Sequence, residues 1–346
     1  MIKKNILCEV KNNLGIIILD RAEALNALNT DMFLILKTQL EKWQCNASIK
    51  AVLIKSNCKK VFCAGGDIRE IYHNRHASLE KAVSYFKLEY EVNSFIDHYS
   101  KPYISFLNGL TMGGGAGISI HGSHPIGTEN LQFAMPETKI GYFPDVGVSY
   151  HLSRLPDAIG IYLGLTGNTI NVADSNKLNL IKYFIPEKNL ESLEKKLIET
   201  NFKYQEKEIV SEIIYSFSKE ADDIDLLKKS NIIKNCFLYD TVEKIFEALK
   251  NNPDEFAKET LHQLNQRSPT SLKVALLQLQ KAKCMDFNQV IEMDWCIAKH
   301  MLLGHDFFEG IRAMIIDKDK NPHWHPFDIA DVTESMVLHY FSGLKK

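Results

Sequence analysis

Two glycine-rich turns, each at the end of an apolar run, are the residues in this sequence best suited to chemistry. Residues 61–67 read Val-Phe-Cys-Ala-Gly-Gly-Asp, and residues 111–117 read Thr-Met-Gly-Gly-Gly-Ala-Gly. Glycine has no Cβ, so its backbone can approach a ligand closely and adopt positive φ. Two such turns that meet could direct two backbone N–H groups at one oxygen, which would form an oxyanion hole for charge developing on a carbonyl.

Two carboxylates follow the second turn, in Pro136-Glu137 and Pro144-Asp145. A carboxylate beside a polarised carbonyl can attack it or can activate water as a general base. Each residue has a structural alternative: Glu137 could be a first-turn acid favoured by a helix dipole, and Asp145 a solvated turn residue. The glycines could likewise serve only tight strand-to-helix connections. The combination of both turns with the two acids indicates acyl or enolate chemistry.

The bulk composition is that of an ordinary globular protein. The chain has 346 residues, of which 45% are hydrophobic and 24% charged, and its net charge is −2. That charge gives no support for a nucleic-acid partner or an anionic membrane surface. The length allows a large core, in one large domain or two smaller ones.

The cysteines, the histidines and the first residues of the sequence indicate the cellular compartment and whether a metal is expected. The seven cysteines are scattered and include no Cys-x-x-Cys pair, which predicts neither a disulfide framework nor a zinc site. None of the twelve histidines shows metal-ligand spacing, so we predict no metal. No apolar run is long enough to span a bilayer, and the chain leads at once into a strand-like segment. We therefore predict a cytoplasmic protein.

The elements that must position the glycine turns alternate between strand and helix. A β-hairpin is predicted for 5–10 and 14–20, and a helix capped by Asn29 or Thr30 for 31–44. Further elements expected before residue 135 are strands at 51–54, 103–107, 124–128 and 131–134, and helices at 79–98 and from the second glycine turn to about His121. This alternation predicts an α/β layer with crossover connections.

After about Ala173 the pattern becomes helical. Helices are predicted at 189–200, 206–218, 222–233, 241–250, 254–265, 269–281, 286–302 and 305–317, with a loop at 321–326 before a short terminal helix. The sequence therefore predicts an α/β core over 1–188 and a helical region over 189–346 that packs on the core.

Several motifs, in this order, resemble those of the crotonase superfamily, also called the enoyl-CoA hydratase/isomerase family. They are Asn26-Ala27-Leu28, Cys63-Ala64-Gly65-Gly66-Asp67, Asn108-Gly109 with Gly113-Gly114-Gly115, Pro136-Glu137, and the segment 306–313. The resemblance spans nearly the whole chain. It implies a spiral β-β-α core with roughly perpendicular sheets, followed by a helical carboxy-terminal region used partly in oligomer contacts.

Within this superfamily the chain is most similar to the branch that hydrolyses 3-hydroxyisobutyryl-CoA, a reaction of valine breakdown. The segments that carry this closer resemblance are 111–115, 133–138, 140–147, 268–273 and 304–307. The resemblance implies an acyl-CoA as the small-molecule partner, no cofactor beyond the CoA of the substrate, and a homo-oligomer as one expected state.

The resemblance also implies roles for individual residues. Gly66 and Gly114 would donate their N–H groups to the thioester carbonyl, and Glu137 would attack it or activate water. Asp145 would orient Glu137 or the substrate hydroxyl, or help to protonate the leaving thiolate. Residues implied at the substrate site are Glu89, with a solvated helix charge as its alternative, and Ala24, Leu25, Ala64, Asp67 and Ile68 along the CoA, with Lys59 and Lys60 in reach of phosphates.

Two features of the sequence depart from related patterns. Hydratases of the superfamily carry a second catalytic glutamate where this chain has Gly117, so the resemblance favours a hydrolase over a hydratase. The hydrolase branch has more glycines where this chain has Val148 and Ser149, and these side chains could narrow the acyl pocket. The alternatives left open are an enoyl-CoA isomerase or hydratase on the same fold, and a non-catalytic acyl-CoA-binding homologue.

Overall fold

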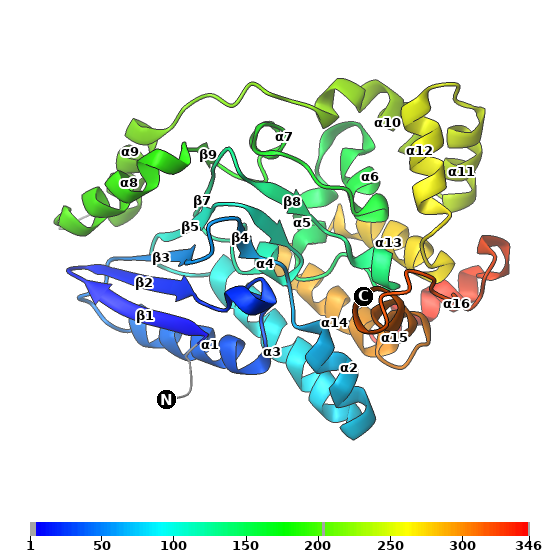
Figure 1. Ribbon diagram of the computed structural model, residues 1–346, viewed down its shortest axis with the longest axis horizontal. Coiled ribbons are helices and arrows are strands. Elements are labelled where there is room, and N and C mark those ends of the chain that lie inside the picture. The colour runs from blue at the N-terminus through cyan, green and yellow to red at the C-terminus, as the bar shows by residue number, and fades with distance from the viewer. Residues whose placement is uncertain (1–4, 203–204, 345–346) are drawn as a thin grey trace. The chain divides into compact units, whose positions relative to one another are not determined.

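The computed structural model describes residues 5–202 and 205–344 (Figure 1). The chain divides into two compact units. The first unit comprises Met1–Gly66, Glu91–Phe133 and Ile170–Leu226, and the second comprises Asp67–Tyr90, Ala134–Thr169 and Leu227–Lys346. The expected division into 1–188 and 189–346 stays a prediction.

A six-stranded sheet is the centre of the first unit. Its order is β1 (Ile6–Lys11), β2 (Leu14–Leu19), β3 (Ala51–Ser56), β5 (Tyr103–Leu107), β7 (His124–Gly127) and β9 (Tyr183–Phe184). β1 and β2 form an antiparallel hairpin, and the other neighbours are parallel. The predicted hairpin, strands and crossover connections are thereby confirmed, because parallel neighbours need a long connection.

Side chains that alternate along the strands cover both faces of this sheet. Leu14 and Ile16 of β2 pack with Leu53 of β3 in a buried cluster that includes α8 (Glu187–Glu199) and α9 (Glu206–Phe217). On β2 the intervening Gly15 lies under Trp43 of α1 (Thr30–Gln44), whose ring would be 2.7 Å from a Cβ at that position. α1 and the α8–α9 pair flank the sheet in Figure 1.

The cap and the apolar stripe of α1 match the sequence prediction. The Asn29 side chain accepts a hydrogen bond from the Met32 N–H, so Asn29 rather than Thr30 is the cap. The buried residues of the helix are Met32, Phe33, Leu36, Leu40 and Trp43.

A second, three-stranded sheet carries the glycine turns, in the order β4 (Val61–Cys63), β6 (Leu110–Met112) and β8 (Gln132–Ala134). The second turn opens α4 (Gly114–Gly117), which is shorter than the predicted helix to His121. Three of its four residues are glycines, which favour a helix least among residues other than proline. Residues 118–121 continue as turns.

Helices make up most of the second unit. They are α2 (Ile68–Ala77), α3 (Leu79–Asp97) as far as Tyr90, η2 (Glu137–Ile140), α5 (Val148–Leu152), η3 (Pro156–Ala158), α6 (Ile159–Thr166), α10 (Ser230–Phe237), α11 (Val242–Asn251), α12 (Glu255–Leu264), α13 (Pro269–Ala282), α14 (Phe287–Met301), α15 (Asp306–Ile311) and α16 (Glu334–His339). None of the helices in the described residues is long and apolar enough to cross a membrane.

Some elements differ from the sequence prediction. Helices α2, α5, α6 and α7 (Val172–Lys177) were not predicted. The segment Ile159–Thr166 of α6 is apolar and buried nearly all round, so it lacks the amphipathic period that identifies surface helices. The helix expected at 222–233 begins only with η4 (Leu226–Lys229), and α15 continues as a π-helix over Arg312–Ile316.

Candidate active site

The two glycine turns contact each other in the first unit. β4 and β6 are parallel neighbours, and Cys63 pairs with Thr111. A Cβ placed on Gly65, whose φ is +113°, would lie 3.3 Å from the Met112 carbonyl oxygen and 3.7 Å from the Gly114 nitrogen. A Cβ on Gly115 would lie only 2.6 Å from the Cys63 carbonyl oxygen. Position 115 therefore requires glycine, because no side chain fits against that carbonyl.

The two proposed oxyanion donors are unengaged within the backbone. Among the residues that the structure describes, neither the Gly66 N–H nor the Gly114 N–H donates to a backbone carbonyl. Gly114 is the first residue of α4, where the N–H groups have no partner within the helix. Free N–H groups at adjoining turns are what an oxyanion hole requires. That role stays a prediction for both residues.

Part of the predicted CoA site also comes together in the first unit. The Ala64 N–H donates to the Leu25 carbonyl at 3.0 Å, and the Leu28 N–H donates to the Gly65 carbonyl at 2.8 Å. Ala24 ends the short η1 helix (Ala22–Ala24), and Leu25 follows with φ of 52° and a half-exposed side chain. The exposed Lys59 and Lys60 precede β4.

Asp67 and Ile68, the remaining residues predicted along the CoA, lie in the second unit at the start of α2. The Asp67 side chain accepts from the Glu70 N–H at 3.3 Å and caps that helix. The Asp67 N–H donates to the Tyr85 hydroxyl at 3.2 Å. These contacts give Asp67 a structural role beside its predicted one.

Asn26 holds the loop between β2 and α1 against the strand that carries the first glycine turn, a role that the sequence motif alone does not reveal. Its side chain accepts from the Arg21 N–H at 2.8 Å and donates to the Ser56 hydroxyl at 2.7 Å and the Phe62 carbonyl at 2.9 Å. The residue is fully buried. Asn26 therefore ties the Ala24–Leu25 segment to the strand that precedes the first glycine turn.

Three buried acids form a cluster in the second unit: Glu89 of α3, Glu137 of η2 and Asp145 of the following loop. These residues are 3%, 8% and 4% exposed, so Glu89 and Asp145 are not the solvated charges that their structural alternatives assumed. Glu137 lies in the first turn of η2, as its alternative assumed, and is buried there. Burial raises the pKa of Glu89 and of Glu137 well above the ordinary value, and the charge of Asp145 raises both further. Burial also raises the pKa of Asp145, to about 7.

Two tyrosines contact this cluster and were not predicted as site residues. The Tyr90 hydroxyl donates to Asp145 Oδ2 at 2.7 Å, and it lies 3.3 Å from the Tyr142 hydroxyl. This hydrogen bond lowers the pKa of Asp145 and opposes part of the effect of burial. The sequence signals were the position of Tyr90 next to Glu89 and of Tyr142 within the motif that carries Asp145.

The loop that carries Asp145 is strained and held from both sides. Val146 has φ of 53° and Gly147 has φ of 77°, and a positive φ is a genuine outlier for a β-branched residue. Gln278 of α13 donates to the Pro144 carbonyl at 2.9 Å, and Asp294 of α14 accepts from the Gly147 N–H at 2.8 Å. Gln278 also donates to Asp294 at 2.7 Å.

The two departures from the hydrolase pattern follow this loop. Val148 and Ser149 begin α5 and are fully buried. The Ser149 hydroxyl has no hydrogen-bond partner among the described residues. Their predicted effect on the acyl pocket stays a prediction.

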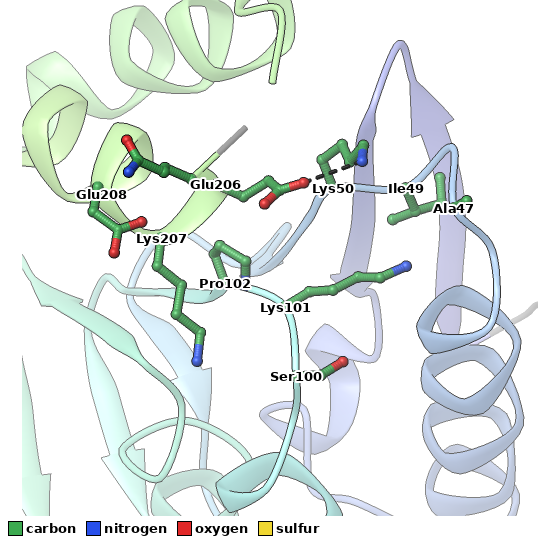
Figure 2. Close-up of a pocket in the computed structure, with 10 residues that line it drawn as sticks. Ala47, Ile49, Lys50, Ser100, Lys101, Pro102, Glu206, Lys207 and Glu208 are labelled. Carbon is green, nitrogen blue, oxygen red and sulfur yellow. Dashed lines mark hydrogen bonds and ion pairs between the residues drawn. The ribbon is translucent and has the colours of Figure 1, made fainter. Parts of the chain in front are cut away.

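A cavity of about 310 Å³ in the first unit has three lysines in its lining, Lys50, Lys101 and Lys207 (Figure 2). Lys50 Nζ lies 3.1 Å from Glu206 Oε1, the contact that Figure 2 marks with a dashed line. The Lys101 amine donates to the carbonyls of Trp43 and Asn46, at the end of α1. Two of the three lysines in this wall therefore serve local structure, and we assign the cavity no function.

The sequence profile of the enoyl-CoA hydratase/isomerase family matches residues 14–341. This chain belongs to the enoyl-CoA hydratase/isomerase family. Among its relatives, the human protein named 3-hydroxyisobutyryl-CoA hydrolase, mitochondrial, is 38% identical over 346 residues, which cover 99% of this chain and 89% of the relative. The zebrafish (Danio rerio) protein of the same name is 38% identical, with 98% and 90% covered.

Solved structures of family members with other names share the fold. A carnitinyl-CoA dehydratase from Mycobacterium thermoresistibile superposes with a TM-score of 0.92, and an enoyl-CoA hydratase from Rhodobacter sphaeroides with 0.91. Each is 30% identical and covers 99% of this chain, which covers 98% of each. The predicted crotonase-like α/β fold is thus confirmed.

Other expectations are not decided by these likenesses. The names of the hydrolase relatives include the word mitochondrial, so the predicted cytoplasmic location is not confirmed and stays a prediction. The expected absence of a metal, of a separate cofactor, and of a nucleic-acid or membrane partner stays a prediction as well, as does the homo-oligomer.

Proposed function

We propose that this chain is an acyl-CoA thioester hydrolase that converts 3-hydroxyisobutyryl-CoA and water into 3-hydroxyisobutyrate and CoA, a step of valine breakdown. One observation carries the choice of hydrolysis. The buried acids Glu137 and Asp145 are present, whereas α4 contains only glycine and alanine and offers no acid where hydratases have one. Support comes from full-length relatives that bear the hydrolase name.

In the first step, the carboxylate of Glu137 attacks the thioester carbonyl carbon. A C–O bond forms, the C–S bond breaks, and the oxyanion accepts hydrogen bonds from the N–H groups of Gly66 and Gly114. The products are a mixed anhydride on Glu137 and the CoA thiolate, which takes a proton from the acid form of Asp145.

In the second step, water cleaves the anhydride. The carboxylate of Asp145 takes one proton from the water, the oxygen forms the new C–O bond of the product acid, and Glu137 leaves as a carboxylate. The proton that Asp145 gives to the thiolate in the first step is replaced by the proton that it takes from water in the second step. A pKa of about 7 allows Asp145 to do both. If Glu137 instead acts as a general base, water attacks the thioester directly, and the same two N–H groups donate to the oxyanion that forms.

The raised pKa values set a requirement for this chemistry. Glu137 must be ionised to attack, yet burial favours its neutral form. The negative charge of the cluster must therefore pass to Glu137 when the substrate binds, and the proton of Glu137 must pass to Asp145. The interaction between the two carboxyls makes such an exchange of one proton reasonable.

The remaining predicted site residues are assigned to substrate binding. We propose that Ala24, Leu25, Ala64, Asp67 and Ile68 border the CoA, and that Glu89 lies at the acyl group. Burial raises the pKa of Glu89 and favours its neutral form, which can donate a hydrogen bond to the substrate hydroxyl.

A second candidate is an enoyl-CoA hydratase or isomerase, which the names of the two superposed structures favour. The test incubates the purified protein with 3-hydroxyisobutyryl-CoA and, separately, with crotonyl-CoA. Release of free thiol and loss of enoyl absorbance are followed in parallel. Thiol release from the first substrate alone supports the proposal. Loss of enoyl absorbance without thiol release contradicts it and supports a hydratase, and no change with either substrate supports a non-catalytic binding protein.

A further inference from the structure

The carboxyl group of Asp145 has one side-chain donor among the described residues, the hydroxyl of Tyr90. The two atoms lie 2.7 Å apart, and both side chains are nearly fully buried. An O–H···O distance of this length is that of a well-formed hydrogen bond, and such a bond is stronger when its acceptor is ionised. The backbone at Asp145 also favours the charged form and lowers the pKa of this carboxyl.

Glu137 lacks such a donor. Its Oε2 atom is buried and has no hydrogen-bond partner among the described residues. The groups that favour its charged form are its own backbone N–H and the more distant Lys139. A buried carboxylate with an unpartnered oxygen is costly, so a single negative charge in this cluster is better placed on Asp145.

The other titratable groups that face Asp145 do not change this assignment. They are Glu89 and Tyr90 of α3, Glu137 of η2, Tyr142 of the connecting loop and Asp294 of α14. Each is neutral or negative, so none supplies a cation that could stabilise a charge on Asp145. The side-chain group that stabilises a negative charge on Asp145 is therefore the hydroxyl of Tyr90.

We propose that Tyr90 is a positioning residue that acts through Asp145: its hydroxyl fixes the orientation of that carboxylate and holds the negative charge of the buried cluster there in the resting site. The role of Asp145 during turnover rests on the proposed hydrolase function and deepens it. Asp145, charged at rest, is the base that accepts the proton of Glu137 when the substrate binds, and is then the acid that protonates the CoA thiolate.

Tyr142 offers a matched control. Its hydroxyl contacts the Tyr90 hydroxyl at 3.3 Å, and no hydrogen bond joins it to Asp145 among the described contacts. Both tyrosines are buried, and each Tyr→Phe change removes one oxygen. Tyr142→Phe therefore perturbs packing and the hydroxyl pair to a similar degree, while the donor to Asp145 stays.

The kinetic test compares the pH dependence of kcat/KM for CoA release in wild type, Tyr90→Phe and Tyr142→Phe, with CoA measured by chromatography. Loss of a hydrogen bond to a charged group should move the acidic limb of the Tyr90→Phe profile up by about one to two pH units. The Tyr142→Phe limb should stay within a few tenths of the wild-type limb. An unchanged limb in Tyr90→Phe, even with a lower rate, overturns the proposal.

A second readout needs no activity. The folded pKa of Asp145, about 7, lies above its ordinary value of 3.8, so this residue's contribution to stability is full below about pH 4 and is lost as the pH rises to 7. In Tyr90→Phe this loss should extend to higher pH, as measured by urea unfolding at several pH values. If wild type and Tyr90→Phe lose stability in parallel, the proposal is wrong. If this readout succeeds while no thioester is cleaved, the proposed function alone fails.

A further variant keeps the test decisive if Tyr90→Phe does not fold. Site-specific replacement of Tyr90 by 3,5-difluorotyrosine retains the hydroxyl and makes it a stronger donor. Both the acidic limb and the stability loss should then move to lower pH. A shift in the other direction, or none, contradicts the role of Tyr90.

Discussion

The two regions to which we assign the chemistry are built from different material. The glycine turns of the first unit offer backbone N–H groups, fixed by a close contact that leaves no room for a side chain at Gly115. The acid cluster of the second unit consists of side chains whose pKa values are moved by burial and by one another. The backbone N–H groups of the first region do not titrate near pH 7, whereas the carboxyl groups of the second region must change their protonation during the reaction. Changes in the first should therefore scale the rate, and changes in the second should also alter its pH dependence.

The largest effect is expected at Glu137. Glu137→Gln keeps the size of the side chain but removes the nucleophile or base, so kcat should fall by about 10³–10⁴-fold. Measurement of CoA release from 3-hydroxyisobutyryl-CoA checks this, with circular dichroism to confirm folding. Full activity in this variant would show that the acid cluster is not the reactive region.

A change of the backbone region alone is available at Gly114. Gly114→Pro removes the N–H at the first position of α4, where helices tolerate proline, and should lower kcat by about 10²–10³-fold. Gly114→Ala keeps the N–H and is the matched control, for which we expect a much smaller loss. Equal losses in the two variants would mean that space, and not the N–H group, matters at this position.

Asp145→Asn should change both rate and pH dependence. The variant lacks the acid that protonates the thiolate, so we expect a loss of about 10²-fold. The limb of the wild-type pH profile near pH 7 should disappear, because the group whose pKa is about 7 is absent. A profile that keeps this limb would assign it to another group and remove Asp145 from the mechanism.

The smallest effect is expected far from the reacting groups. Asn29→Ala removes the cap of α1 and should lower the free energy of unfolding by about 1 kcal/mol, with kcat and the pH profile unchanged. Urea unfolding with a parallel activity assay measures both. A changed pH profile of kcat in Asn29→Ala would show that a substitution in the first unit also alters the titration of the acid cluster.

The same contrast explains what the sequence could reveal. A glycine turn is visible because few residues can replace glycine at a close contact, and Glu137 is visible from the residues that flank it. The Tyr90–Asp145 hydrogen bond joins residues 55 apart in the sequence, and no local pattern indicates it. The degree of burial, which moves the pKa of Asp145 to about 7, is likewise a product of tertiary packing.

The sequence predicted the fold to a similar extent. Short apolar runs located the central strands, whose residues are buried on both faces of the sheet, and helical periodicity located α1, which buries one face. They failed for α6, which is buried nearly all round, and for α4, where glycines end the helix early. The role of Asn26 also escaped, since its three hydrogen bonds reach residues that only the folded chain brings together.

The acid cluster of the second unit titrates near pH 7, and the backbone N–H groups of the glycine turns do not. The most direct test measures kcat/KM for CoA release across pH 5 to 9, a range of about two units on either side of the pKa of Asp145, in wild type and Gly114→Pro together. We predict two parallel curves, with the same acidic limb near pH 7 and a constant ratio between them. A limb that moves when only the Gly114 N–H is removed would contradict this division of the chemistry.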